Sequence, residues 1–151
     1  MQVSKRDGTQ EDLDIEKLHK VVMYACDGIS GVSPSEVEIH SQIQFFNGIS
    51  TKDIQETLIK STADLISEEY PNYQYVAGRL INYHLRKMVY GQFEPLHLRN
   101  IAKINVDRGF YDAEFFELYN DAEIDELNNH VKHDRDDVLT YAAMEQFRGK
   151  Y

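Results

Sequence analysis

The sequence is poor in cysteine and in long apolar runs. One cysteine among 151 residues excludes an internal disulfide and a zinc site built from several thiolates. This residue, Cys26, falls in a helical apolar pattern and is predicted to be a small core residue. No stretch approaches the length of about 18 apolar residues that a membrane helix needs. Lys5 and Arg6 stand where a signal peptide would begin its apolar core, so we expect a cytoplasmic protein without membrane contact.

Basic residues are outnumbered by acidic ones. The chain has 16 Lys and Arg against 26 Asp and Glu, a formal net charge of −10. Binding to DNA or RNA depends on basic surface that neutralises phosphates, so we expect no nucleic-acid polymer as a partner. A single nucleotide needs only a few local cations. The sequence contains neither a G-x-x-x-x-G-K-[ST] loop nor a G-x-G-x-x-G loop, so a nucleotide site here would be of another type.

The N-terminal two thirds of the chain predict a hairpin followed by four helices. Asp7-Gly8 is a turn signal between short alternating segments, which predicts a β-hairpin from Val3 to Leu13. Helical periodicity with capping residues then predicts helices that begin at Asp14, Ser33, Ser50 or Thr51, and Tyr73. We expect them to end before Gly28, near Phe46, near Glu69 and before Gly91, with these residues in the core: Leu18, Val21, Val22, Ala25, Ile54, Leu58, Leu65, Ile66, Val76, Ala77, Leu80, Ile81, Leu85 and Met88.

A change in composition predicts a domain boundary after Gly91. Pro95 disfavours helical geometry in the residue before it, and short helical patterns without strands follow. Asn120 with Glu123 forms a capping box in one of them. We therefore predict a first domain over residues 1–91 and an incomplete second segment over residues 92–151. The last residues, RGKY, carry no helix cap or polar tail, from which we expect a fragment of a longer protein.

Four cations and one histidine are candidates for binding a phosphate-bearing ligand. Lys5, Arg6, Lys17 and Lys87 converge if the hairpin, the first helix and the end of the fourth helix meet. Lys and Arg form the stronger, charge-assisted hydrogen bonds to phosphate. The alternative is that these are solvated surface cations, as most lysines are. His84 is either a satisfied interior histidine or a contact to a bound base or phosphate.

The segment HVKHDRDD combines residue types that can bind metals. Its His and Asp side chains have the right chemistry, but zinc sites need three or four arranged ligands with supporting hydrogen bonds. An acidic helix end with capping or buried histidines is the simpler interpretation, and we predict no metal site. The residues concerned are His130, His133, Asp134, Asp136 and Asp137.

Several motifs, in order along the chain, resemble one known family. Residues 3–8 (VSKRDG) followed by Asp14 and Lys17 are similar to the V-x-K-R-D-G…D-x-x-K-[IL] signature of the ATP-cone, an allosteric nucleotide-binding domain. The stretches KDIQET (52–57), NYQYVA (72–77), HLRKMVYGQFEP (84–95) and HDRD…TYAAMEQFRGKY (133–151) resemble the large, or alpha, subunits of aerobic class I (Ia) ribonucleoside-diphosphate reductases.

The resemblance implies a fold and a set of binding residues. It implies a mainly α-helical protein, with an N-terminal β-hairpin over a four-helix ATP-cone bundle and then short helices that begin a truncated catalytic domain. The hairpin would cover a triphosphate bound with Mg²⁺. Lys5, Arg6 and Lys87 would contact phosphates, Lys17 and the backbone near Glu11 and Asp14 the base, and Thr51 the ribose, with His84 as a further contact. Gln55 departs from the family, because some relatives have histidine there.

The resemblance also implies a regulatory role without catalysis by this chain. The family's cone binds ATP as an activator and dATP as an inhibitor of ribonucleoside diphosphate reduction, whereas its catalytic residues lie further along the chain. Implied partners are the radical-bearing small (beta) subunit and further copies of the large subunit. A transcriptional repressor with the same cone would need a four-cysteine zinc ribbon, which Cys26 alone cannot build. The remaining alternative is a helical protein-interaction module that has lost nucleotide binding.

Overall fold

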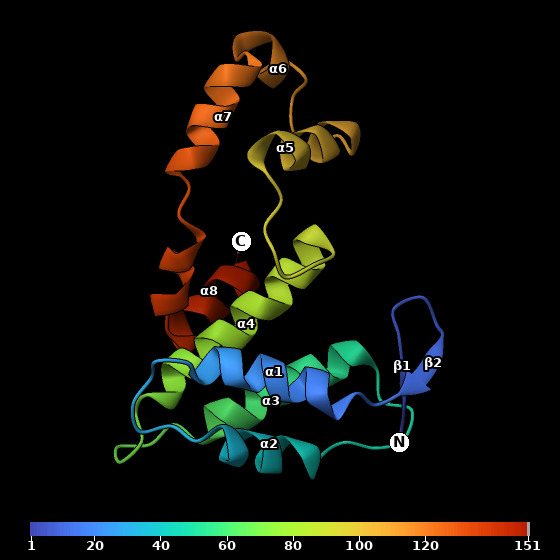
Figure 1. The fold of residues 1–151 in the computed structure, drawn as a ribbon, viewed down its shortest axis with the longest axis vertical. Helices are drawn as coiled ribbons and strands as arrows, with labels where there is room; N and C mark the ends of the chain where they lie inside the picture. Colours follow the sequence, from blue (N-terminus) through green and yellow to red (C-terminus); the bar gives the residue numbers. More distant parts are fainter. Residues whose placement is uncertain (151) are drawn as a thin grey trace. The chain divides into compact units, whose positions relative to one another are not determined.

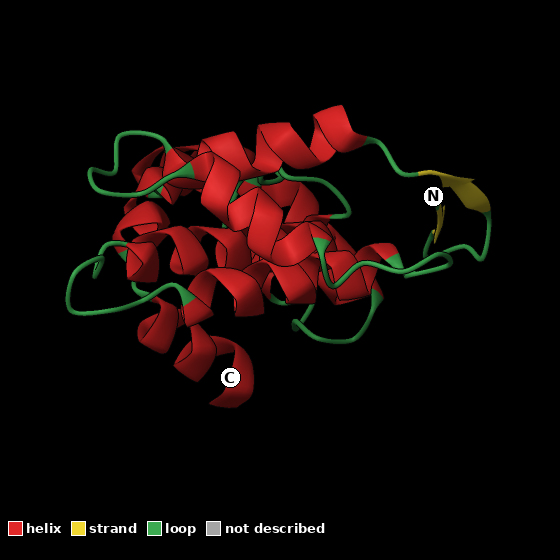
Figure 2. Ribbon diagram, turned by 90° about the horizontal axis from the view of Figure 1, so that it is seen from below, coloured by secondary structure: helices red, strands yellow, loops and turns green. Residues whose placement is uncertain are grey.

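The computed structural model describes residues 1–150 and is mainly helical, with an N-terminal two-stranded hairpin, as predicted (Figures 1 and 2). The strands pair antiparallel, with Val3 opposite Glu11. The elements in chain order are β1 (Gln2–Ser4), β2 (Gln10–Asp12), α1 (Ile15–Cys26), α2 (Pro34–Gln42), α3 (Thr51–Asp64), α4 (Tyr73–Tyr90), α5 (Leu98–Asp107), α6 (Phe115–Leu118), α7 (Asp121–His130), the 3₁₀ helix η1 (His133–Val138) and α8 (Tyr141–Lys150).

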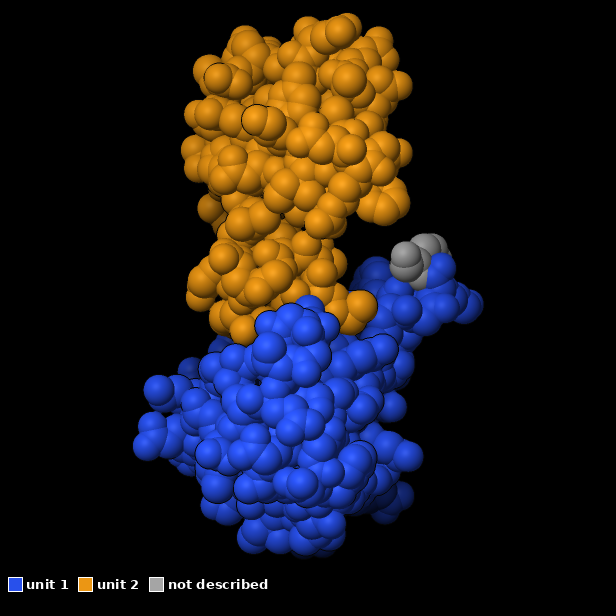
Figure 3. Space-filling model, turned by 90° about the vertical axis from the view of Figure 1, so that its right-hand side faces the viewer, with its two compact units in different colours: residues 1–85, 136–151 blue, residues 86–135 orange. Residues whose placement is uncertain are grey.

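The chain forms two compact units (Figure 3). The first unit contains Met1–Leu85 together with the chain from Asp136 onward, and the second contains Arg86–Arg135. Helix α4 therefore contributes to both units. The boundary that the sequence predicts after Gly91 stays a prediction.

Local sequence signals place the starts of α1, α2, α3 and α7 correctly. Asp14, Ser33, Ser50 and Asn120 have extended backbones, and each side chain accepts a hydrogen bond from the backbone N–H three residues later. These bonds satisfy amide groups that a helix start otherwise leaves unpaired. At the hairpin tip Gly8 has φ +84°, a conformation that glycine adopts at little cost. The predicted turn and caps are confirmed.

Helix α2 ends earlier than predicted. It stops at Gln42 and not near Phe46, and the chain continues in turns. The Asn47 side chain there accepts a 2.8 Å hydrogen bond from the backbone N–H of Gln2. The segment after α2 thus contacts the hairpin through Asn47, and helical periodicity gives no sign of such a tertiary contact.

Helix α3 also ends early, and two predicted core positions are wrong. The helix stops at Asp64 and not near Glu69, and its last turn tightens because the N–H of Leu65 bonds three residues back. Ile66, beyond this end, is 36% exposed. Met88 is 56% exposed in the part of α4 that belongs to the second unit. Helical periodicity shows which face of a helix is apolar, but it does not show where along the helix the elements that pack on that face end.

The core of the first unit joins the hairpin, α1 to α4 and α8. Helix α8 contributes Met144, while Leu139 and Tyr141 pack on the outside of the same core. Cys26 is buried, as predicted. The buried apolar residues of this core are Val3, Leu18, Val21, Val22, Ala25, Cys26, Val37, Ile49, Ile54, Leu58, Ile59, Tyr73, Val76, Leu80, Ile81 and Met144.

The second unit is smaller and has few buried side chains. Helix α5 packs against α7, with Ala102 and Ile124 buried. Arg99 pairs with Asp125 at 2.6 Å, and the guanidinium of Arg86 lies 5.0 Å from the centre of the Phe93 ring. None of the helices described over residues 1–150 has the length and apolar character needed to cross a membrane.

Candidate functional site

The hairpin is attached to the start of α3. The backbone N–H of Ser4 donates to the carbonyl of Ile49 at 3.0 Å, and that of Gly48 donates to Gln2 at 2.8 Å. Ser4 also forms a parallel bridge with Ser50, the N-cap of α3. Lys5 and Arg6 directly follow Ser4 in the chain, and Thr51 directly follows Ser50. The structure therefore brings two predicted phosphate contacts close to the N-terminus of α3.

Lys5 is held by a carboxylate across the hairpin. Its Nζ lies 2.6 Å from Oε2 of Glu11, with both side chains partly exposed. The hydrogen bond to Glu11 raises the pKa of Lys5. Lys5 and Glu11 are both predicted site residues, and in this structure they form an ion pair with each other. At the tip, the Asp7 carboxylate accepts hydrogen bonds from the backbone and hydroxyl of Thr9, which lower the pKa of Asp7 and fix the turn.

Asp14 and Lys17 define the start of α1. The Asp14 carboxylate accepts a 2.9 Å hydrogen bond from the backbone N–H of Lys17, so its first role is that of a helix cap. The Lys17 side chain is exposed in the first turn. Because only Leu13 and Asp14 separate β2 from α1, both residues stay near the base of the hairpin.

His84 is a buried histidine with one unpartnered nitrogen. The residue is 2% exposed, and Nε2 lies 3.4 Å from Oε1 of Glu56. Within residues 1–150, Nδ1 has no hydrogen-bond partner. Burial lowers the pKa of the ring, Glu56 acts against this shift, and the positive charges of Arg148, Arg6 and Lys52 add to it. The charge of Arg6 in the hairpin is therefore one of those that lower the pKa of His84 in α4.

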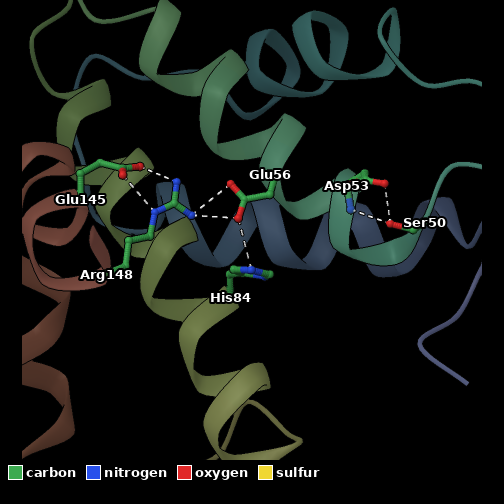
Figure 4. A network of polar contacts seen from close by, with 6 residues as sticks. All are labelled: Ser50, Asp53, Glu56, His84, Glu145 and Arg148. Atoms are coloured by element: carbon green, nitrogen blue, oxygen red, sulfur yellow. Dashed lines mark hydrogen bonds and ion pairs between the residues drawn. The ribbon is translucent and has the colours of Figure 1, made fainter. Parts of the chain in front are cut away.

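Glu56 belongs to a polar network that the sequence did not predict (Figure 4). Nη1 of Arg148 lies 3.0 Å from both Glu56 oxygens, and Nε of Arg148 donates to Glu145 at 3.1 Å. These carboxylates raise the pKa of Arg148. The three-residue spacing of Glu145 and Arg148 is visible in the sequence as a helical pair. The link to Glu56 carries no sequence signal, because it depends on how α8 returns to α3.

Two further predicted features can be located. Gln55, the departure from the family pattern, has an Oε1 atom that is buried and without a partner in the described part of the chain. Lys87 lies in the last turn of α4 and belongs to the second unit. Its place in a common site with Lys5 stays a prediction.

The histidine-rich segment spans the end of α7 and η1. Nδ1 of His130 lies 2.8 Å from the carbonyl oxygen of Glu126, one turn earlier in α7. The carbonyl of His133 accepts a 3.0 Å hydrogen bond from Arg86. Over residues 1–150, no three His, Cys, Asp or Glu side chains are grouped as metal ligands.

Comparison with known proteins relates this arrangement to a family. A family model described as "ATP cone domain" matches residues 1–88. The chain is 47% identical over 149 residues to ribonucleoside-diphosphate reductase 1 subunit alpha of Escherichia coli (strain K12), covering 99% of this chain and 20% of that protein. It is 46% identical over 151 residues to the alpha subunit of Haemophilus influenzae, covering 100% and 20%. For the alpha subunit of enterobacteria phage T4 the identity is 39% over 149 residues, covering 99% and 20%.

The chain thus spans about a fifth of the length of these relatives. The family match begins at the hairpin and ends within α4, so it includes Lys5, Arg6, the start of α3 and His84. The resemblance seen in the sequence motifs is confirmed: the chain belongs to the ATP cone domain family and is similar over its whole length to ribonucleoside-diphosphate reductase alpha subunits.

Proposed function

We propose that this chain is the allosteric, nucleotide-binding region of a ribonucleoside-diphosphate reductase alpha subunit, with ATP as activator and dATP as inhibitor. One observation carries the proposal. The hairpin with Lys5 and Arg6 is attached to the N-terminus of α3, within the residues that match the ATP cone domain. Lys5 and Arg6 are thus two adjacent cations close to a helix N-terminus, which is itself a favourable position for phosphate groups.

The triphosphate end of the ligand would lie against the hairpin. Lys5 and Arg6 would form charge-assisted hydrogen bonds to phosphate oxygens, with Lys87 as the third cation and Mg²⁺ neutralising further charge. Lys5 pairs with Glu11, so binding would exchange a carboxylate for a phosphate. This exchange costs little, because an exposed ion pair contributes little free energy.

The nucleoside end would lie toward the start of α1 and α3. We assign the base to the backbone near Glu11 and Asp14 and to the side chain of Lys17. Thr51, in the first turn of α3, would contact the ribose. The buried ring of His84 offers a further contact, because its Nδ1 is unpartnered within the described residues.

ATP and dATP differ by one hydroxyl group. A hydrogen bond that is made or left unpaired is worth about 1–3 kcal/mol, which changes a balanced equilibrium but does not overturn a strongly biased one. Regulation would therefore act on assemblies that are nearly equal in free energy, or through several cones together. We propose the radical-bearing beta subunit and other alpha subunits as the partners in those assemblies. The residues of this chain would carry no catalytic step.

The test is thermal denaturation of the 151-residue chain with and without ATP-Mg or dATP-Mg. A ligand that binds only the folded form raises its stability by about 2.7 kcal/mol at a concentration of 100 times its Kd. We expect a clear rise in midpoint with dATP-Mg, largely lost in the Lys5→Ala, Arg6→Ala double variant. The matched control is Lys103→Ala with Arg108→Ala, which removes two exposed cations from the α5 region of the second unit.

Two outcomes contradict the proposal. A wild-type midpoint that does not move at millimolar nucleotide would favour the helical interaction module that has lost nucleotide binding. An equal shift in the hairpin variant and the control would move the site away from Lys5 and Arg6.

A further inference from the structure

The chain from Asp136 to Lys150 belongs to the same compact unit as the ATP cone domain although it lies outside the family match, which ends at residue 88. Asp137 anchors it in two ways: its carboxylate accepts a 2.8 Å hydrogen bond from the Tyr24 hydroxyl, and its carbonyl accepts a 3.1 Å bond from Nε of Arg79. Met144 of α8 is buried in the core of the first unit. This segment therefore packs on α1 and α4 within the first unit.

Arg148 holds the carboxylate of Glu56 in place. Its Nη1 lies 3.0 Å from both oxygens of Glu56, while its Nε and Nη2 bond to Glu145 (Figure 4). Arg148 is 21% exposed and Glu56 39%. A planar guanidinium bonded on two edges has little rotational freedom, and it restricts its carboxylate partners in the same way. Helix α8 thus fixes a side chain of α3.

Glu56 links this network to His84. Its Oε1 lies 3.4 Å from Nε2 of His84. An ionised carboxylate only accepts hydrogen bonds, so a neutral ring that carries its hydrogen on Nε2, toward Glu56, has Nδ1 as an acceptor. Burial lowers the pKa of His84, which favours the neutral ring at neutral pH. The charged groups that act on this ring are Glu56 and Lys52 of α3, Arg148 of α8 and Arg6 of the hairpin.

We propose that Arg148 is a positioning residue of the effector site: through Glu56 it holds His84 in one orientation and one tautomer, so that nucleotide binding and the docking of α8 stabilise each other. The inference rests on the proposed function, because it takes His84 as a nucleotide contact. Loss of Arg148 frees the Glu56 carboxylate and removes the cation that compensates its charge beside His84. Coupling between two sites is reciprocal, so occupancy of the nucleotide site also strengthens the docking of α8.

The first test is calorimetric titration of dATP-Mg into the 151-residue chain. We expect Arg148→Met to weaken binding about fivefold or more, a usual size for coupling between sites. Lys150→Met removes a cation from an exposed position of the same helix and should leave affinity within about twofold. In a Glu56→Gln background, Arg148→Met should add less than about twofold, because the carboxylate through which it acts is gone. A purely structural role would give additive losses.

The second test needs no variant. Addition of dATP-Mg to the wild-type chain should slow hydrogen exchange of the α8 amides severalfold, whereas unchanged exchange in α8 beside a protected hairpin would overturn the inference. The inference would also be overturned by an Arg148→Met variant that folds and binds dATP-Mg within about twofold of the wild type. Affinity losses that add in the double variant would overturn it as well. If the wild type binds neither dATP nor ATP, the proposed function fails and this inference fails with it.

Discussion

Nη1 of Arg148 lies 3.0 Å from both carboxylate oxygens of Glu56, 92 positions earlier in the chain. The pair joins α8 to α3 within the first unit, and Glu145 and His84 extend it at either end. This ion pair and the burial of Met144 in the core together attach α8 to the rest of the first unit. The attachment explains why the compact unit includes residues beyond those matched by the family.

Arg148→Met should destabilise the chain moderately. The variant leaves Glu56 and Glu145 without their shared cation, but both carboxylates are partly exposed, so water screens the loss. We expect a loss of about 1 kcal/mol and a fall in Tm of about 2–4 °C. Differential scanning calorimetry measures both, with Lys150→Met as the control for loss of one charge. An Arg148→Met variant that is as stable as the wild type would show that the network contributes nothing to folding.

Gly78→Ala should be destabilising although the position is helical. A Cβ atom there would lie 2.2 Å from the backbone oxygen of Leu139, and backbone cannot move aside as a flexible side chain can. Alanine normally stabilises a helix by about 1 kcal/mol relative to glycine, but overpacking costs about 1–3 kcal/mol and should exceed that gain. Urea denaturation provides the comparison.

The matched control for this substitution is Gly149→Ala in α8. A Cβ at Gly149 meets nothing within 4 Å in the described part of the chain, so this variant should be as stable as the wild type or slightly more stable. A Gly78→Ala variant that gains stability as Gly149→Ala does would mean that residues 139–140 do not approach α4 closely.

His84 should make the free energy of unfolding depend on pH at values above those at which carboxylates titrate. Burial lowers the pKa of its folded form below the ordinary 6.5, so the unfolded chain binds a proton first as the pH falls. This contribution is complete above pH 6.5 and is lost as the pH falls from there through the lowered pKa. Urea denaturation between about pH 7.5 and pH 5 should show a smaller fall in unfolding free energy for His84→Gln than for the wild type.

His40→Gln, at an exposed position of α2, controls for the loss of one histidine. It should keep the wild-type dependence on pH. If His84→Gln shows the full wild-type dependence, the ring is protonated equally in the folded and unfolded chains.

Cys26 should be unreactive in the folded chain. Burial raises the pKa of its thiol to about 11, so little of the reactive thiolate is present near neutral pH, and reagents cannot reach the side chain. At pH 8 we expect slow reaction with a thiol-specific disulfide reagent in buffer and complete reaction within minutes in concentrated guanidinium. Rapid reaction of the folded chain would show that the end of α1 opens readily.

Helix starts, the hairpin turn and most core positions could be predicted from the sequence because their causes are local. A capping side chain such as Ser50 bonds an amide three residues away, and Gly8 provides the turn through its own backbone freedom. Helix ends were predicted less well. The end of α2 depends on the contact between Asn47 and Gln2, which lie 45 positions apart.

The candidate site also has residues that local sequence signals predicted and residues that depend on distant contacts. Lys5 and Arg6 were found by their motif, and their place beside α3 follows from strand contacts of Ser4. Glu56 and Arg148 were missed, because neither side chain stands out in its own helix and only their meeting makes a network.

The sequence by itself determined the helical class, the positions of the turn and caps, and the family, since each depends on residues close together in the chain or on ordered motifs. The tertiary structure decided which charges meet. It paired Lys5 with Glu11 and joined His84, Glu56 and Arg148. The physical reason is that an ion pair or hydrogen bond depends on distances of a few ångströms. Between elements far apart in the sequence, only the packing of the core sets such distances.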